Sequence, residues 1–142
     1  MKTLRAMAMG LALLLVCGVS QAASVISHGN STKDDVIDTY LNAVVHGKLN
    51  GISEAIDDDA QFDMKRGNSV NTLSKPQILD ALKSGENVEQ DCQCTKTVLQ
   101  SDDEKSVVKV DMKYNDFTRT DVITAQHAGN GWKITKVETS YK

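Results

Sequence analysis

Aromatic residues are scarce in this sequence: two Phe, one Trp and three Tyr make up 4% of its 142 residues. A binding pocket would therefore have few rings on which a ligand could stack. The chain also lacks a cluster of Lys and Arg, and its formal net charge is -3, which argues against a phosphate backbone as the main partner. Beyond its first residues it has no apolar run near the roughly 20 residues that a spanning helix needs. We therefore expect a protein that neither binds nucleic acid nor spans a membrane.

The common signatures of cofactor and catalytic sites are absent as well. The sequence has no Gly-x-Ser-x-Gly elbow, no Gly-Lys-Ser phosphate loop and no dinucleotide fingerprint. Its three histidines, His28, His46 and His127, are far apart in the chain and lack the spacing of metal ligands. We therefore predict no metal and no cofactor.

The one long apolar run lies at the N-terminus, in MKTLRAMAMGLALLLVCGVSQAAS. Lys2 and Arg5 flank the start of an apolar stretch over residues 6–16, and Ser20-Gln21-Ala22 resembles a small-x-small cleavage site. This layout is typical of a secretory signal peptide.

The domain organisation follows from that segment. We predict a signal peptide over residues 1–22, a flexible leader over 23–31 and one domain over 32–142, secreted or periplasmic. A lipid anchor on Cys17 is disfavoured because the bulky Val16 stands directly before it.

Two cysteines remain after cleavage, in the segment DCQCTK. In an extended strand Cys92 and Cys94 would face the same side, at a spacing too long for an unstrained disulfide. A bulge or bend at Gln93 would still let them close in an oxidising compartment. A redox or metal site, a strained local disulfide and two packed thiols all remain open, and a single Cys-x-Cys pair is a weak zinc signal.

Helical periodicity appears in three segments. In TKDDVIDTYLNAVVHG, Thr32 is placed to cap a helix that Gly47 ends. A second short helix fits residues 49–56. In SKPQILDALKSG, Ser74 and Gln77 form a capping-box pattern and Gly85 supplies the stop.

The remaining segments alternate with period two. AQFDMKRGNSVNTL predicts a hairpin that turns at Gly67-Asn68, with Phe62 and Met64 facing one way and Asp63 the other. Before it, Asp57-Asp58-Asp59 reads as a solvated turn. The last third, from QCTKTVLQS through VVKVDMKYNDF and RTDVITAQHA to WKITKVETSY, predicts long strands in an antiparallel meander. Helices and strands in this order predict an α+β fold.

The order of these segments resembles a known superfamily. VIDTYLNAVVHGKLNGISEAIDDDAQF, SKPQILDAL and YNDFTRTDVITAQHAGNGWKITKV together resemble the nuclear transport factor 2-like superfamily, and within it the secreted bacterial SnoaL-like group named putative lumazine-binding proteins. The resemblance implies a cone-shaped fold, with a curved antiparallel sheet packed on three helices, a pocket in the mouth of the cone and a homodimer formed through the sheet.

The isomerases of this superfamily carry an aspartate base in a pattern like DATVEDP. When DAQFDMK is laid on that pattern, Met64 occupies the base position, and a thioether cannot take a proton. Asp63 is one residue away, which turns it to the opposite face of the strand. We therefore predict no catalytic residue there.

Strand parity and the shape of the superfamily suggest a set of pocket residues. The candidates for ligand binding are Tyr40, Phe62, Met64, Met112, Tyr114 and Trp132. Core packing explains each of them as well, and Asp116, Arg119 and Asp121 fit either the rim of a pocket or a solvated turn.

We expect a non-catalytic module that binds a small apolar or heteroaromatic ligand or acts as a dimeric interaction unit. The alternative is a cofactor-free isomerase or cyclase that uses a pocket tyrosine with a carboxylate such as Asp121. A third outcome is a cone filled by side chains, with the sheet face used for protein contacts.

Overall fold

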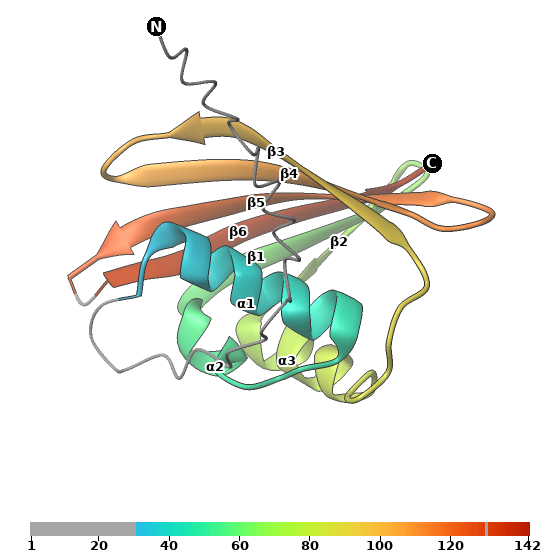
Figure 1. The fold of residues 1–142 in the computed structure, drawn as a ribbon, viewed down its shortest axis with the longest axis horizontal. Helices are drawn as coiled ribbons and strands as arrows, with labels where there is room; N and C mark the ends of the chain where they lie inside the picture. Colours follow the sequence, from blue (N-terminus) through green and yellow to red (C-terminus); the bar gives the residue numbers. More distant parts are fainter. Residues whose placement is uncertain (1–30, 130) are drawn as a thin grey trace, which may run out of the picture.

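The structure is a computed structural model that describes residues 31–129 and 131–142. The predicted signal peptide and nearly all of the predicted leader lie outside the described residues. In chain order the elements are α1 (Lys33–His46), α2 (Ile52–Ala55), β1 (Ile56–Arg66), β2 (Ser69–Leu73), α3 (Lys75–Lys83), β3 (Gln93–Ser101), β4 (Lys105–Lys113), β5 (Thr118–Ala128) and β6 (Gly131–Tyr141) (Figure 1). No helix in this part of the chain is long and apolar enough to cross a membrane.

Helix α1 begins and ends as its sequence predicts. The side chain of Thr32 accepts a hydrogen bond from the amide of Asp35 at 3.2 Å, and the Asp35 carboxylate accepts one from the Thr32 amide at 2.9 Å. At the other end Gly47 has φ 64°, and an added Cβ would lie 2.5 Å from the Gly85 carbonyl oxygen. Both the backbone conformation and the close approach of the loop after α3 therefore require glycine at position 47.

Helix α3 shows the predicted capping box at Ser74 and Gln77, where the Ser74 amide donates to Gln77 Oε1 at 2.9 Å. Helix α2 is shorter than predicted, because strand β1 already begins at Ile56. The prediction of a turn at Asp57-Asp58-Asp59 is therefore wrong. Burial on both sides, at Ile56 and Ala60, holds these aspartates in the strand while the side chains of Asp58 and Asp59 stay exposed. The Asp57 carboxylate accepts from the Asp59 amide at 2.9 Å, and the pairing of β1 with β6 is irregular between Ile56 and Gln61.

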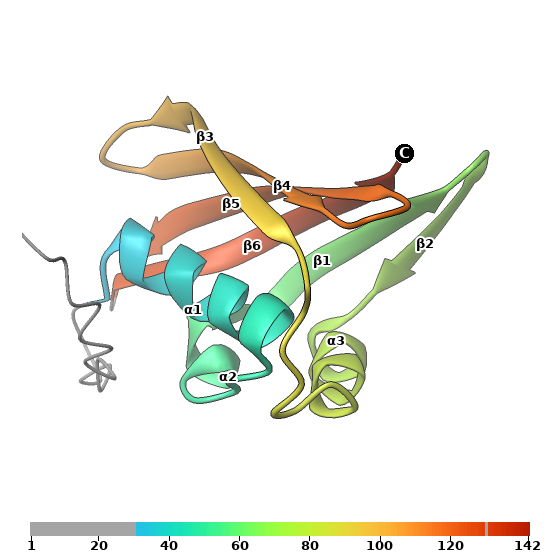
Figure 2. The same cartoon turned by 45° about the vertical axis from the view of Figure 1, so that its right-hand side comes forward.

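The strands form one curved sheet in the order β2-β1-β6-β5-β4-β3 (Figure 2). Strands β3 to β6 form the predicted antiparallel meander, and β1 and β2 the predicted hairpin. The sheet is mixed rather than antiparallel throughout, because β6 runs parallel to β1. After β2, the segment through α3 carries the chain to the opposite edge of the sheet, where β3 lies. From there the meander runs back strand by strand toward β1, and its last strand, β6, lies beside β1 and points in the same direction.

The hydrophobic core lies between the helices and one face of the sheet, as the α+β cone fold requires. Helix α1 lies along this inner face, over β5 and β6. Every second residue of β4 is buried there, including Val108, Val110 and Met112. Asp63 and Asp111 lie on the outer face, as predicted: Asp63 accepts a hydrogen bond from Thr72 at 2.7 Å and Asp111 one from Thr120 at 2.6 Å.

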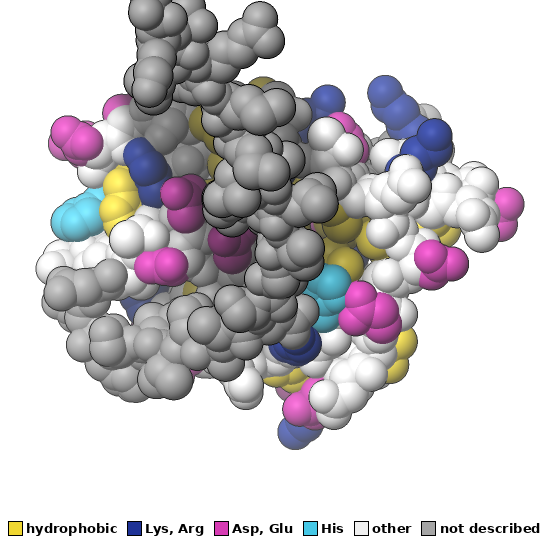
Figure 3. Space-filling model, viewed as in Figure 1, with side chains coloured by type: hydrophobic (Ala, Val, Ile, Leu, Met, Phe, Trp, Pro, Cys, Tyr) yellow, Lys and Arg dark blue, Asp and Glu magenta, His cyan; other side chains and the backbone are white. Residues whose placement is uncertain are grey.

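Strand β3 differs from its neighbours because all of its residues are exposed. It forms one edge of the sheet and curves over the side of α1 (Figures 1 and 2). Its links to α1 are polar: Lys96 Nζ lies 3.0 Å from Asp38, and Lys33 Nζ lies 2.6 Å from Ser101 Oγ. Acidic and basic side chains are interspersed over the described surface visible in Figure 3, without a broad patch of one sign.

Candidate functional site

A buried polar cluster lies in the core, under α1. Arg119 and Asp121 are two residues apart on β5, so both face the interior, and Thr139 faces Asp121 from β6. Tyr40 reaches the same point from α1. The Asp121 carboxylate is fully buried, and the Arg119 side chain is 17% exposed.

Every acceptor position of the Asp121 carboxylate is occupied from within the protein. Oδ1 accepts from Arg119 Nε at 3.0 Å and from Thr139 Oγ1 at 2.8 Å. Oδ2 accepts from Tyr40 OH at 2.8 Å and from Arg119 Nη2 at 2.9 Å. An ionised carboxylate has about four lone-pair sites, so none remains for the proton of a substrate.

The electrostatics of the cluster favour one protonation state. Burial, and next the charge of Asp121, raises the pKa of Tyr40 well above its usual range. Burial alone would lower the pKa of Arg119, but the neighbouring Tyr40 and Asp121 outweigh it and raise that pKa overall. The tyrosine therefore stays a neutral donor and the arginine a cation, which is the arrangement of a structural ion pair.

Met64, which matches the position of the isomerase base, lies close to this cluster. It pairs with Thr139 across β1 and β6, so it shares the inner face and is half-buried. The side chain that faces the interior at this position is thus a thioether, and the adjacent carboxylate of Asp63 faces outward and bonds to Thr72.

An open hollow of about 330 Å³ lies at the end of the sheet where β1, β5 and β6 meet the turns. We call it the aromatic hollow; its lining residues are Arg66, Gly67, Phe117 and Tyr141. The Arg66 guanidinium lies over the Tyr141 ring, 5.5 Å from its centroid, and the Phe117 ring lies 6.1 Å from that ring. Phe117 is 42% exposed, so this hollow presents an aromatic face to solvent.

A second hollow, of about 370 Å³, lies beside it. We call it the cysteine hollow; it is lined by Asp91, Cys92, Gln93, Lys113, Tyr114 and Asn115. The Tyr114 ring stacks on Phe117 at 4.5 Å, so this pair of rings joins the two hollows. Burial, and next the Cys92 thiol, raises the pKa of Tyr114 to about 12, and its neutral hydroxyl donates to Gln90 Oε1 at 3.2 Å.

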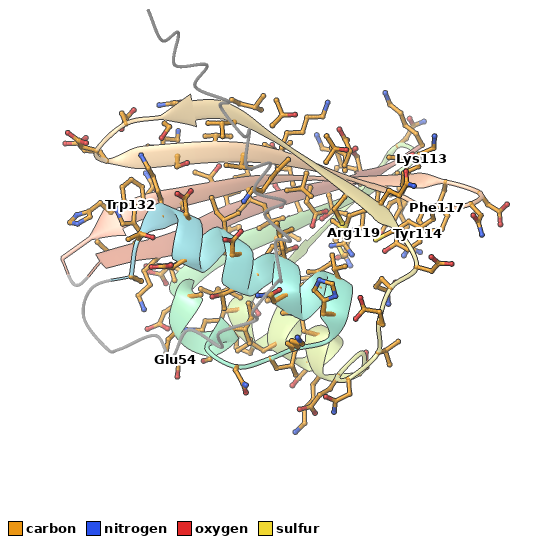
Figure 4. All side chains as sticks on the ribbon, in the orientation of Figure 1. Glu54, Lys113, Tyr114, Phe117, Arg119 and Trp132 are labelled. Atoms are coloured by element: carbon orange, nitrogen blue, oxygen red, sulfur yellow. The ribbon has the colours of Figure 1, made fainter. Side chains whose placement is uncertain are left out.

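The structure does not bring all of the predicted pocket residues together. Tyr40, Phe62 and Met112 are almost fully buried in the core. Tyr114 lines the cysteine hollow, whereas Trp132 lies at the other end of the sheet (Figure 4). About nine residues of β6 separate Trp132 from the aromatic hollow, which is roughly 30 Å of strand.

The cysteines and histidines are placed as follows. Cys92 and Cys94 are free thiols with their sulfur atoms 3.8 Å apart. His46 Nδ1 lies 2.5 Å from Glu89, and His127 packs edge-on against Trp132 at 5.7 Å, while His28 lies outside the described residues. Within residues 31–129 and 131–142 no three His, Cys, Asp or Glu side chains are grouped as metal ligands.

Three lining residues of the aromatic hollow were absent from the sequence prediction: Arg66, Phe117 and Tyr141. Phe117 stands in the turn between β4 and β5, and Tyr141 is the last residue of β6. An aromatic residue in an otherwise polar turn was the available signal, because turns rarely need a large ring for packing.

Solved structures place the fold in a known class, the nuclear transport factor 2-like proteins. A nuclear transport factor 2-like protein of unknown function from Silicibacter pomeroyi superposes with a TM-score of 0.64 at 13% identity, covering 77% of this chain and 92% of that one. A putative calcium/calmodulin-dependent protein kinase type II association domain from Thiobacillus denitrificans gives 0.59 at 10%, covering 80% and 98%. A putative ketosteroid isomerase from Parabacteroides distasonis gives 0.54 at 14%, covering 77% and 86%.

These identities are low, so the similarities establish the fold alone. The family follows from the sequence: the chain belongs to the family described as "Putative lumazine-binding", whose sequence pattern matches residues 30–141. The resemblance that the sequence predicted is thereby confirmed. No curated protein matches the chain.

Proposed function

We propose that this protein is a secreted or periplasmic, non-catalytic domain that binds a small flat heteroaromatic ligand in the aromatic hollow. The observation that carries the proposal is the exposed ring of Phe117 beside Tyr141 and Arg66, in a chain that has only six aromatic residues. The description of the family, putative lumazine-binding, points to the same chemical class.

The size and chemistry of the aromatic hollow suit such a ligand. Its volume of about 330 Å³ is at the small end of the roughly 300–1,000 Å³ of ligand pockets, which matches a fused two-ring molecule better than a steroid. The Phe117 ring offers a stacking face, and the Arg66 guanidinium can pair with ring carbonyl oxygens or stack on the ring.

Among the described residues, neither the buried cluster nor the lining of the aromatic hollow offers a free carboxylate, which supports a binding role over catalysis at these places. General acid–base chemistry needs a group within hydrogen-bond reach of the substrate. Asp121 already accepts four hydrogen bonds inside the core, and Met64 carries no proton-accepting group. An isomerase or cyclase that uses Tyr40 with Asp121 would have to break this cluster first.

The proposal is tested by titrating the protein with lumazine in a calorimeter. Stacking of a base on an aromatic side chain contributes about 1–3 kcal/mol, so Phe117→Ala should weaken binding roughly 5- to 150-fold. Val98→Ala is the matched control, because it removes an apolar side chain that is 62% exposed but lies on β3.

Equal binding by the Phe117→Ala variant and the unchanged protein would refute the site. No heat of binding in either protein at millimolar lumazine would refute the ligand. Conversion of a β,γ-unsaturated ketone to its conjugated isomer, abolished by Asp121→Asn, would favour the enzyme instead.

The homodimer is part of the same proposal. In the described chain the helices cover only the inner face of the sheet, and Val107 and Val122 lie half-buried on the outer face. We expect two copies to pack through that face, and light scattering coupled to size exclusion measures the mass directly. A monomer at micromolar concentration would contradict it.

A further inference from the structure

The two thiols at the start of β3 are in contact. Their sulfur atoms lie 3.8 Å apart. Residues i and i+2 of an extended strand are spaced by about 6.6 Å, so the two side chains must lean toward each other to meet at this distance. Cys92 can do so because it precedes β3, which begins at Gln93, and the ladder of the sheet does not fix it.

Little of the fold resists a closer approach of the two residues. A disulfide needs Cβ atoms about 3.8 Å apart, which requires a bend at Gln93. Gln93 forms the first pair of the β3–β4 ladder, with Lys113, and β3 is an edge strand that pairs with β4 alone. The bend therefore disturbs one terminal pair and leaves the rest of the sheet in register.

The cysteine hollow gives another molecule access to the pair. Cys92 lines this hollow of about 370 Å³, and Asp91 and Lys113 line it with opposite charges. Cys94 is exposed as a whole residue, but the local burial of its thiol, and next the hydrogen bond with Cys92, raises the pKa of Cys94 to about 11. Cys94 therefore keeps its proton, and Cys92, which lines the hollow, is the thiol placed to attack a molecule that enters it.

We propose that Cys92 and Cys94 form a dithiol redox site that exchanges with a disulfide-bonded substrate entering the cysteine hollow. The Cys92 thiolate attacks one sulfur of the substrate, which forms a mixed disulfide and releases the other sulfur as a thiol. Cys94 then loses its proton and attacks the Cys92 sulfur, which releases the second substrate thiol. The protein loses two protons and two electrons, and the substrate disulfide takes them up and is reduced to two thiols.

The test uses oxidised and reduced glutathione as the probe. The full chain is equilibrated in glutathione buffers, once folded and once unfolded in urea, then quenched with acid and digested with trypsin. Residues 84–96 form one tryptic peptide that contains Cys92 and Cys94 and excludes Cys17. We expect this peptide to lose two hydrogens, with an equilibrium constant about tenfold larger for the folded chain than for the unfolded one, because folding holds the sulfurs in contact.

Single variants test the order of the two steps. In Cys94→Ser the mixed disulfide between Cys92 and glutathione should accumulate, because the second step is blocked. Cys92→Ser should acquire glutathione several times more slowly, because Cys94 does not line the hollow and the burial that raises its pKa remains in this variant. Equal rates in the two variants would overturn the assignment of Cys92 as the attacking thiol.

Three results would overturn the site itself. The first is an equilibrium constant for the Cys92–Cys94 disulfide that is no larger in the folded chain than in the unfolded one. The second is a disulfide between two chains in place of the internal one. The third is glutathione retained on the peptide of the unsubstituted protein, which would show that Cys94 cannot reach the Cys92 sulfur.

Discussion

Replacing Asp121 by asparagine removes one negative charge from the core with almost no change in volume. The carboxylate accepts hydrogen bonds from Tyr40, from Thr139 and twice from Arg119. In asparagine one of the two oxygens becomes an NH₂ group, which is itself a hydrogen-bond donor. It would face the Tyr40, Thr139 or Arg119 donors that already point at that position. The substitution also leaves the Arg119 guanidinium without its counter-charge, and only 17% of that side chain is exposed.

The size of the loss follows from this burial. Removing one partner of a buried ion pair costs about 3–5 kcal/mol, because the other charge stays desolvated. For a domain of about 110 residues, 1 kcal/mol shifts the midpoint of thermal unfolding by about 4 °C, so the expected decrease is roughly 12–20 °C. Asp63→Asn is the matched control: this side chain lies on the outer face, bonds to Thr72 and should cost less than about 1 kcal/mol.

Urea unfolding followed by circular dichroism measures both variants at neutral pH. Adding Arg119→Leu to Asp121→Asn should recover part of the loss, since it removes the unpaired charge. If Asp121→Asn and Asp63→Asn lose equal free energy of unfolding, the buried cluster does not stabilise the fold and the argument for its structural role fails.

Two further predictions concern the end of α1 and alkaline pH. Gly47→Ala combines a positive φ with a Cβ 2.5 Å from a carbonyl oxygen, so it should lower the free energy of unfolding by at least about 3 kcal/mol. Gly67→Ala, with φ 59° and open space around the added Cβ, should lower it by about 1 kcal/mol. Equal midpoints of urea unfolding in the two variants would contradict this. Burial raises the pKa of Tyr40 in the folded state above about 10, the usual tyrosine value. The neutral Tyr40 therefore stabilises the fold fully below about pH 10, and this contribution is lost as the pH rises from there toward the pKa in the folded state. The free energy of unfolding between about pH 9 and 11 should therefore fall more steeply in the unchanged protein than in Tyr40→Phe, and parallel curves would refute it.

Much of the fold was predictable because its signals are local. The caps at Thr32 and Ser74 and the stop at Gly47 each depend on hydrogen bonds or dihedral angles within a few residues. The alternation of Val108, Val110 and Met112 directly encodes which face of β4 is buried. Such patterns need no knowledge of distant contacts.

The features that escaped prediction depend on distant partners. The start of β1 at Ile56 is set by pairing with Ile134 on β6, and the parallel direction of that pair depends on the path of the whole chain. The sequence left Asp121 at the rim of a pocket or in a solvated turn, and only the fold shows that it is buried and that Tyr40 and Arg119 bond to its carboxylate. Likewise Arg66, Phe117 and Tyr141 form a hollow only because three strand ends meet there.

The pairing of β1 with β6 also dictates when this protein can fold. Strand β1 is the first strand of the described chain, yet its parallel partner β6 is the last one in chain order and is therefore made after all the others. Until then α1 has no finished sheet to cover, and contacts between segments so distant along the chain form slowly. A nascent chain that stops before β6 therefore lacks both the inner neighbour of β1 and part of the surface on which α1 packs.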